Sequence, residues 1–353
     1  MENVQQINSD QTAQMAIRTE QQNLSFILPN SSEIGHLWTS YQAETVSVCM
    51  LKQYVHETVE PEIRLLLQRA LDVSSQRVLA METIFNNINH PIPAAFGEED
   101  VKVSSEKLFN DYFKLAYTRL MHKLILINYC QAFTSSYRSD FRNYFKECID
   151  TSQEIIQSTT NVLIAKGALI HSPYIGIPTT IDFVQDKNYA GTLLGDTRPI
   201  NALELSHLTS LLEIKMLIRL KVIALSEIVR SDSIRNHFKR FIHIADKQID
   251  KLESFLDDQH LPKPSAIDYE VKDSKESPFS DRLMMSHATV TTADIIAGYG
   301  LAIPNSPNLK LVSTYHRFTT ELLDLAKDAS KLMIENNWLE RIPEAFDRET
   351  LLH

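Results

Sequence analysis

Glycine is scarce in this sequence, with 8 in 353 residues, about a third of the usual frequency. This scarcity argues against a sheet with many tight turns and against a glycine-rich phosphate loop, because both need backbone conformations that glycine adopts most readily. The GxSxG, P-loop, GxGxxG and HExxH patterns are also missing. The common signatures of serine hydrolases, nucleotide-binding proteins and zinc peptidases are therefore excluded.

Cysteine and long hydrophobic runs are also rare. Cys49, Cys130 and Cys148 are the only cysteines, and an odd number without close pairs gives neither a disulfide framework nor a metal motif. All three lie in apolar helical patterns, so we expect them to be small buried residues. No apolar segment approaches the ~18 residues of a membrane span, and the N-terminus lacks the features of a signal peptide. We expect a cytoplasmic protein with no membrane span.

The charge balance is acidic. The 35 Lys and Arg residues against 45 Asp and Glu residues give a net charge of −10, which repels phosphate, so we expect no nucleic-acid partner. Charged residues make up 23% and hydrophobic residues 43% of the chain, a composition typical of globular proteins. A length of 353 residues suits two domains of roughly 150 residues, each with its own core.

The sequence repeats itself with an offset of about 170 residues. An offset of 171 aligns residues 33–37 with residues 204–208, and an offset of 170 aligns Tyr129 with Tyr299. The hydrophobic class of the residues agrees, nearly without gaps, over about 140 positions, and chance seldom produces such a match. The sequence therefore predicts a tandem duplication.

The repeat defines the predicted domain organisation. Copy 1 spans residues 31–171 and copy 2 spans residues 200–346. Between them, residues 172–199 contain several prolines and glycines and form a linker, which we expect to pack on the bundles because it also contains aromatic residues. Residues 1–30 are expected to be a mobile N-terminal tail and residues 347–353 a C-terminal tail.

Apolar residues at helical spacing fill both copies. One stripe runs from Leu311 to Leu332 at intervals of four and three residues, a pattern typical of an antiparallel bundle helix. Polar capping residues precede several of these stripes, and we expect four helices in each copy. The predicted helices span residues 32–59, 61–89, 106–136 and 138–167 in copy 1 and residues 201–230, 232–259, 278–304 and 308–337 in copy 2.

The lengths of the connections predict the topology. About three residues join helices 1 and 2 of each copy, and likewise helices 3 and 4, so these pairs are antiparallel neighbours. Helices 2 and 3 are joined by residues 90–105 in copy 1 and 260–277 in copy 2; such a segment spans up to ~50 Å, more than the ~40 Å of the helix. We therefore predict an all-α protein, a tandem duplication of ferritin-like four-helix bundles with a long crossover between helices 2 and 3 of each copy. A simple up-down-up-down bundle is the alternative.

A ferritin-like topology raises the question of a di-iron site, which needs Glu from two helices and Glu-x-x-His from the other two. The pairs Glu33-x-x-His36 and Glu204-x-x-His207 have this spacing. They lie in a first helical turn and not at mid-helix, and there a capping box after Ser or Asn explains the glutamate without a metal. Neither copy contains a complete ligand set, so no cofactor is predicted. The candidate ligands for iron or another divalent metal are Glu33, His36, Glu204, His207 and His287.

Three segments resemble a known protein family: residues 198–208 (RPINALELSHL), 277–285 (SPFSDRLMM) and 333–340 (MIENNWLE). They are similar to a two-repeat family of unknown function, largely from endospore-forming Gram-positive bacteria, to which spore coat protein F is distantly related. The resemblance extends from about residue 30 to the end of the chain. It implies a ferritin-like four-helix bundle in each repeat and a spore-associated setting, and it implies no reaction or catalytic residue.

Three functions are compatible with these observations. The favoured interpretation is a non-enzymatic duplicated helical-bundle protein with a structural or interaction role, for which a homodimer or another protein partner is expected. The first alternative is a metal-binding ferritin-like protein with oxidase or storage chemistry. The second is a small-molecule binder with a cavity inside one bundle or between the two.

Overall fold

Eight α-helices form the part of the chain that the computed structural model describes, residues 27–104, 106–192, 198–266 and 269–345. All eight predicted helices are confirmed. The largest difference is at the third, which begins at Asp111 and not near residue 106, because the preceding residues belong to the connection. The helices are α2 (Ser31–Glu57), α3 (Pro61–Asn87), α4 (Asp111–Ser135), α5 (Ser139–Ala165), α6 (Ala202–Ile228), α7 (Asp232–Asp257), α8 (Asp281–Ala302) and α9 (Leu309–Glu335), with a short 3₁₀ helix, η2 (Glu98–Asp100).

Each copy is a four-helix bundle with a crossover. In copy 2, α6 packs against α7 and α8, and α9 packs against the same two helices. In copy 1, α2 packs against α3 and α4, and α5 packs against the same two. The first helix is thus a neighbour of the third, whereas an up-down-up-down bundle would place it beside the fourth. The predicted crossover topology is confirmed, and the simpler alternative is wrong.

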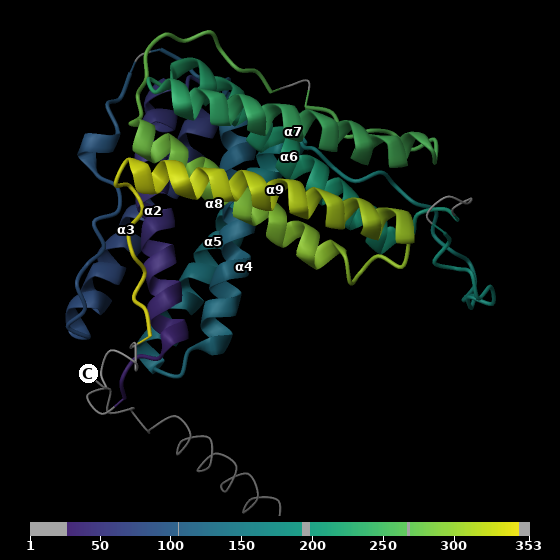
Figure 1. The fold of residues 1–353 in the computed structure, drawn as a ribbon, viewed down its shortest axis with the longest axis horizontal. Coiled ribbons are helices and arrows are strands. Elements are labelled where there is room, and N and C mark those ends of the chain that lie inside the picture. The colour runs from purple at the N-terminus through teal and green to yellow at the C-terminus, as the bar shows by residue number, and fades with distance from the viewer. Residues whose placement is uncertain (1–26, 105, 193–197, 267–268, 346–353) are drawn as a thin grey trace, which may run out of the picture.

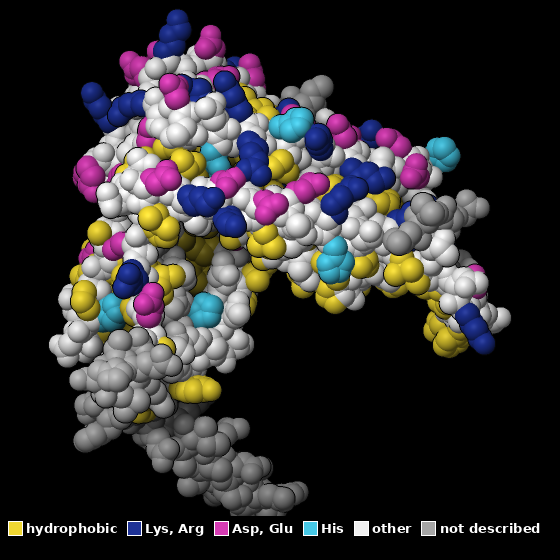
Figure 2. All heavy atoms as spheres, in the orientation of Figure 1, with side chains coloured by type: hydrophobic (Ala, Val, Ile, Leu, Met, Phe, Trp, Pro, Cys, Tyr) yellow, Lys and Arg dark blue, Asp and Glu magenta, His cyan; other side chains and the backbone are white. Residues whose placement is uncertain are grey.

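The two bundles cross near one end of copy 1. Figure 1 shows α2 to α5 running upright, with α6 to α9 lying across their upper end. Hydrophobic side chains are visible in the hollow below this crossing (Figure 2). None of the helices in the described part of the chain is long and apolar enough to cross a membrane.

The crossover connections, residues 88–110 and 258–280, pair with each other about a pseudo-twofold axis. Val101 forms an antiparallel bridge with Phe279, and Phe109 forms one with Val271. The offset of 170 converts the first bridge into the second, so the two copies contribute the same surface to their contact, as in a twofold dimer. The backbone hydrogen bonds around these bridges obey the same rule: Lys102 N to Pro278 O (2.7 Å), Lys272 N to Leu108 O (2.9 Å), Ser280 N to Asp100 O (2.9 Å) and Asn110 N to Glu270 O (3.1 Å).

One hydrophobic core runs through both copies. Buried side chains of all four helices of copy 2 belong to the same cluster as those of α2, α3, α4 and α5 that lie toward the crossing. A second, smaller cluster fills the remote end of copy 1, around Leu37, Phe85 and Phe141. Because apolar burial is the main stabilising force in folding, the two copies are expected to behave as one fused unit.

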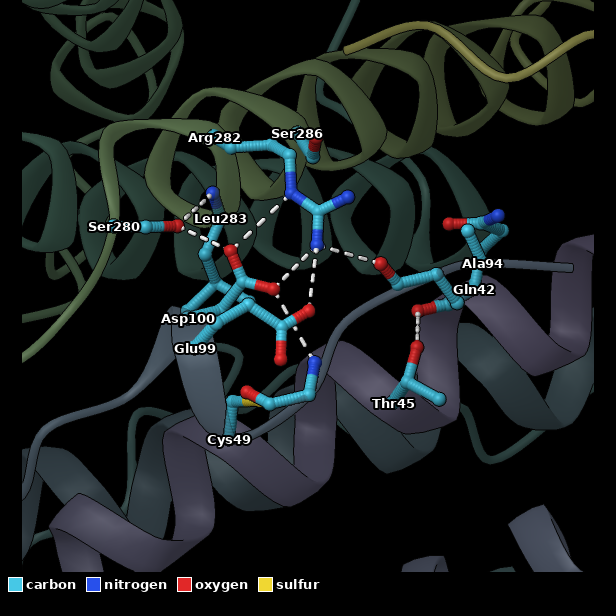
Figure 3. Close-up of polar contacts among 12 residues, drawn as sticks. Gln42, Thr45, Cys49, Ala94, Glu99, Asp100, Ser280, Arg282, Leu283 and Ser286 are labelled. Carbon is cyan, nitrogen blue, oxygen red and sulfur yellow. Dashed lines mark hydrogen bonds and ion pairs between the residues drawn. The ribbon is translucent and has the colours of Figure 1, made fainter.

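A polar cluster fixes Arg282 of α8 on the connection of copy 1 (Figure 3). Its guanidinium pairs with Asp100 and donates a hydrogen bond to Ala95 O (2.7 Å). Asp100 also accepts hydrogen bonds from Ser280 Oγ (2.5 Å) and from Gly97 N (3.2 Å). Burial raises the pKa of Asp100, but hydrogen bonds from Arg282, Ser280 and Gly97 outweigh it, so this pKa lies below its usual value. The cluster therefore holds an ionised pair across the copies.

Among the described residues of the linker, those near its two ends pack on the bundles. Pro173 is buried, and Ala190 O accepts a hydrogen bond from Leu309 N of α9 (3.1 Å). Residues 174–188 are exposed, with Ile177 at 93%. The prediction that the linker packs on the bundles therefore does not hold for residues 174–188. Aromatic residues in a segment do not show whether an apolar surface lies next to them.

Two other expectations concern single residues and the chain ends. Cys49 and Cys148 are buried, as expected, but Cys130 is exposed. The apolar pattern of α4 does not reveal this, because Cys130 lies on the solvent side of the helix near its end.

The predicted tails lie outside the described residues, apart from residues 27–30.

The exposed linker and the shared core together predict how a nicked chain behaves. Trypsin should cut after Lys187, which lies in the exposed segment. Because the copies share one core, the two fragments should remain associated and elute in native gel filtration at the volume of the intact chain, while a denaturing gel separates them. Elution as two half-size particles would show that the copies fold independently.

Candidate functional site

A cavity of about 100 Å³ lies where the two copies meet. Its walls come mainly from α2 and α4 of copy 1 and from α6 and α8 of copy 2. Most of the surface that faces the cavity is apolar, although polar residues also converge on it, and such a wall is typical of small-molecule sites. The apolar lining is Ala43, Val46, Met50, Leu51, Met121, Leu124, Ile125 and Val290, and the polar lining is Glu44, Ser47, Tyr54, Ser74, Tyr117, Thr118, His122, Asn128, Lys221, His287 and Asp294.

A buried lysine reaches this cavity from copy 2. Lys221 of α6 is 2% exposed, and its Nζ lies 2.7 Å from His287 Nε2. The same Nζ lies 4.1 Å from the centre of the Tyr117 ring. Burial lowers the pKa of Lys221 well below its usual value, and burial together with Lys221 does the same to His287. Among the described residues, no carboxylate forms an ion pair with this amine.

His287 and Tyr117 are equivalent residues of the two copies, related by the offset of 170, and they meet at the pseudo-twofold axis. Tyr117 Oη lies 2.6 Å from His287 Nε2. The Nε2 of His287, a candidate metal ligand, therefore contacts the hydroxyl group of Tyr117 and the amine of Lys221. Both contacts occupy a nitrogen that would have to be free to bind a metal.

Three polar atoms on the cavity wall have no hydrogen-bond partner in the described structure: Tyr54 Oη, Thr118 Oγ1 and His122 Nδ1. Their residues are 2%, 4% and 5% exposed, respectively. Leaving such a group unsatisfied costs about 1–3 kcal/mol, and buried polar groups of this kind usually bind ordered water or a ligand. The wall therefore offers hydrogen-bonding capacity that no neighbouring side chain uses.

The pKa values of two further lining residues are shifted. Burial raises the pKa of Asp294 to about 7. Burial, and then the positive charge of Arg77, lower the pKa of His122 to about 4, against a smaller opposing effect of Glu44. At neutral pH His122 is therefore uncharged and Asp294 is only partly ionised. Perturbed groups that gather in one cavity favour a functional site.

Arg77 fills the middle of the copy 1 bundle, the position that a di-iron site would take. Its Nη1 donates to Glu44 Oε1 (2.8 Å), and its Nη2 donates to Cys148 O and to Ser152 Oγ (2.8 Å each). Tyr129 Oη donates a short hydrogen bond to the same Glu44 oxygen. The carboxylate thus already has a cationic partner from the protein itself.

Copy 2 has a different set of polar residues at the same level. Lys215 takes the position of Glu44 and Gln248 that of Arg77, with Lys215 Nζ 2.5 Å from Gln248 Oε1. Burial lowers the pKa of Lys215 to about 7, against an opposing effect of Glu321. Neither copy therefore presents paired carboxylates at mid-bundle.

The predicted ligands Glu33 and Glu204 satisfy helix ends. Glu33 accepts hydrogen bonds from the backbone N–H groups of Asn30 (2.8 Å), Tyr137 (2.7 Å) and Arg138 (2.8 Å). It therefore satisfies donors at the start of both α2 and α5. The equivalent contacts of Glu204 are from Asn201 N (3.0 Å), Asn308 N (2.9 Å) and both terminal nitrogens of Arg198 (2.8 Å each).

The five candidate ligands do not form one site in the described structure. His36 and His207 are half-buried, and burial lowers the pKa of each, while His287 lies in the cavity. No three His, Cys, Asp or Glu side chains of the described residues lie close enough to hold a metal ion. Metal binding stays a prediction that metal analysis has to test.

Sequence reasoning missed Lys221, Tyr54 and Thr118. One signal was present, because Lys215 and Lys221 each stand between apolar neighbours in α6. A lysine on a buried helix face indicates a functional or paired group, since lysine is almost never fully buried otherwise. The pattern does not reveal, however, that Lys221 meets copy 1.

Comparisons with known proteins bear on the family of the chain. No curated protein matches the sequence. A crystal structure from Bacillus halodurans, named as a "putative spore coat protein", aligns with a TM-score of 0.40 and 16% identity, over 44% of this chain and 100% of that chain. The family described as "Protein of unknown function (DUF3231)" matches residues 24–181 and again residues 190–351. The chain therefore belongs to the DUF3231 family and contains its characteristic region twice.

Proposed function

We propose that this protein binds a small molecule in the cavity that its two copies build together. The observation that carries the proposal is the set of three unpartnered polar atoms on an otherwise largely apolar wall. A duplicated chain can form such a site because the two halves approach it with different side chains, as His287 and Tyr117 illustrate. The lining contains no recognisable catalytic arrangement, so the proposal is binding without chemistry.

The sequence also predicts roles and properties other than ligand binding. A structural or interaction role, a spore-associated setting and a homodimer stay predictions; localisation in sporulating cells and sedimentation analysis would test them. Metal binding has less support than ligand binding, because the carboxylates of Glu33 and Glu204 are engaged by helix ends and Arg77 occupies mid-bundle.

Blocking the cavity should weaken the binding of an apolar probe. Val290 of α8 lines the cavity and is 47% exposed, so Val290→Trp adds volume at the mouth without overpacking a buried site. We expect the affinity for 1-hexanol, measured by ligand-observed NMR or calorimetry, to fall at least about tenfold, or 1.4 kcal/mol.

The matched control is Leu301→Trp, on the same helix. Leu301 is 53% exposed and does not line the cavity, so this variant should bind 1-hexanol as the wild type does. The proposal fails if wild-type protein does not bind the probe, or if Val290→Trp binds it with unchanged affinity.

A further inference from the structure

The cavity offers one basic amine and an apolar body. Lys221 is the only Lys or Arg among the described residues that line it. A buried amine without an acidic partner is costly to charge. The faces of Tyr117 and Tyr54, whose ring centres lie 4.1 and 5.8 Å from Nζ, compensate only in part. An incoming anion would supply the missing partner.

A second donor lies at the same end of the cavity. Tyr54 presents its ring to Lys221, and its hydroxyl group has no partner in the described structure. Burial raises the pKa of Tyr54 well above its usual value, so the hydroxyl keeps its proton. An amine and a hydroxyl that can both donate are suited to an oxygen anion such as a carboxylate.

The rest of the wall is suited to a hydrocarbon chain. From Tyr54 the lining continues along α2 through Met50 and Val46, and along α4 through Met121 and Ile125. Residues 43 to 54 of one helix extend over ~16 Å, so a volume of about 100 Å³ spread along this length is narrow. A slender aliphatic chain fits such a shape better than a bulky ring system.

We propose that the cavity binds a small aliphatic carboxylate, with its carboxylate on Lys221 Nζ and Tyr54 Oη and its chain along the apolar walls. This inference rests on the proposed function and names the ligand class of that same site.

The acidic groups of the cavity allow an anion at this end. Glu44 of α2 is neutralised by Arg77, and Asp294 of α8 is only partly ionised near neutral pH because burial raises its pKa to about 7. His122 of α4 and His287 of α8 are uncharged there, since burial lowers the pKa of both. Burial also lowers the pKa of Lys221, so the amine is the group that would take up a proton and pair with an entering carboxylate.

Three probes of equal chain length separate charge from apolar fit: hexanoate, 1-hexanol and hexylamine, titrated into the full-length chain. We expect hexanoate to bind at least tenfold more tightly than 1-hexanol, and hexylamine more weakly than either. Lys221→Met should lower the affinity for hexanoate at least tenfold and lower that for 1-hexanol by a much smaller factor. Replacing a buried amine with an apolar side chain of similar length is often neutral or stabilising, so this variant should fold.

Lys215→Met is the matched control. Lys215 is 1% exposed, lies on the same helix and does not line the cavity, so its loss should leave the preference for hexanoate intact. Binding of 1-hexanol without a preference for hexanoate, or tighter binding of hexylamine, would overturn the carboxylate assignment and leave the proposed function standing. If no probe binds, the proposed function fails and this inference fails with it.

Discussion

Replacing Arg77 with methionine should lower the free energy of unfolding by about 3–5 kcal/mol, because the change leaves the Glu44 carboxylate buried without its partner. The two side chains are 5% and 2% exposed and lie 2.8 Å apart. The substitution also removes hydrogen-bond donors from Cys148 O and Ser152 Oγ. Urea unfolding followed by circular dichroism measures the loss.

Two further variants show whether burial causes the effect. Arg69→Met removes a guanidinium from the same helix, but its partner Glu154 is 3.4 Å away and both side chains are more than half exposed, so the loss should stay below about 1 kcal/mol. The double variant Arg77→Met with Glu44→Met removes both buried charges and should recover most of the stability. Equal losses of stability in Arg77→Met and Arg69→Met would show that burial of the pair does not cause the effect.

The pH dependence of Arg77→Met should have a definite sign. In the wild type, burial raises the pKa of Glu44, but Arg77 and hydrogen bonds outweigh it, so the folded-state pKa lies below the ordinary value. The carboxylate therefore stabilises the fold above its unfolded-state pKa, and this contribution is lost as the pH falls through the folded-state pKa. Without Arg77, burial dominates and raises the pKa of Glu44. The destabilisation by Arg77→Met should then be smaller in acid than at neutral pH.

Glu204→Ala should cost about 2–4 kcal/mol of stability, because one carboxylate satisfies the ends of two helices and pairs with Arg198. Burial raises the pKa of Glu204, but Arg198 and the backbone N–H groups of Asn201 and Asn308 together outweigh burial. The pKa of Glu204 therefore lies below its usual value. This contribution should be lost as the pH falls through that lowered pKa. Chemical unfolding of metal-free protein in the presence of a chelator measures the change.

The matched variant His207→Ala distinguishes helix capping from metal binding. His207 lies one turn later on α6 and is half-buried, so its loss should cost no more than about 1 kcal/mol. If the pair held a metal, both variants would lose it and the chelator would destabilise the wild type. Stoichiometric metal that disappears in both variants would restore the metal-binding alternative.

The sequence indicates few residues of the candidate site and does not show how they are arranged. His287 was singled out, and its equivalence to Tyr117 follows from the repeat offset. That these two meet across the pseudo-twofold axis depends on how the crossover connections pair, through Val101 and Phe279. No local pattern encodes that pairing, because its partners, such as Val101 and Phe279 or Phe109 and Val271, lie far apart in the sequence.

The sequence by itself determined the duplication, the helices and the crossover in each copy. Helices follow from apolar periodicity and from caps within a few residues, such as Asn201 with Glu204, and the crossover is favoured by the length of a connection. Only the tertiary structure decided that the copies share one core, that residues 174–188 stay exposed and that Lys221 reaches a cavity walled by α2 and α4. The reason is physical: local patterns depend on neighbours along the chain, whereas these features depend on which surfaces of two finished bundles bury each other.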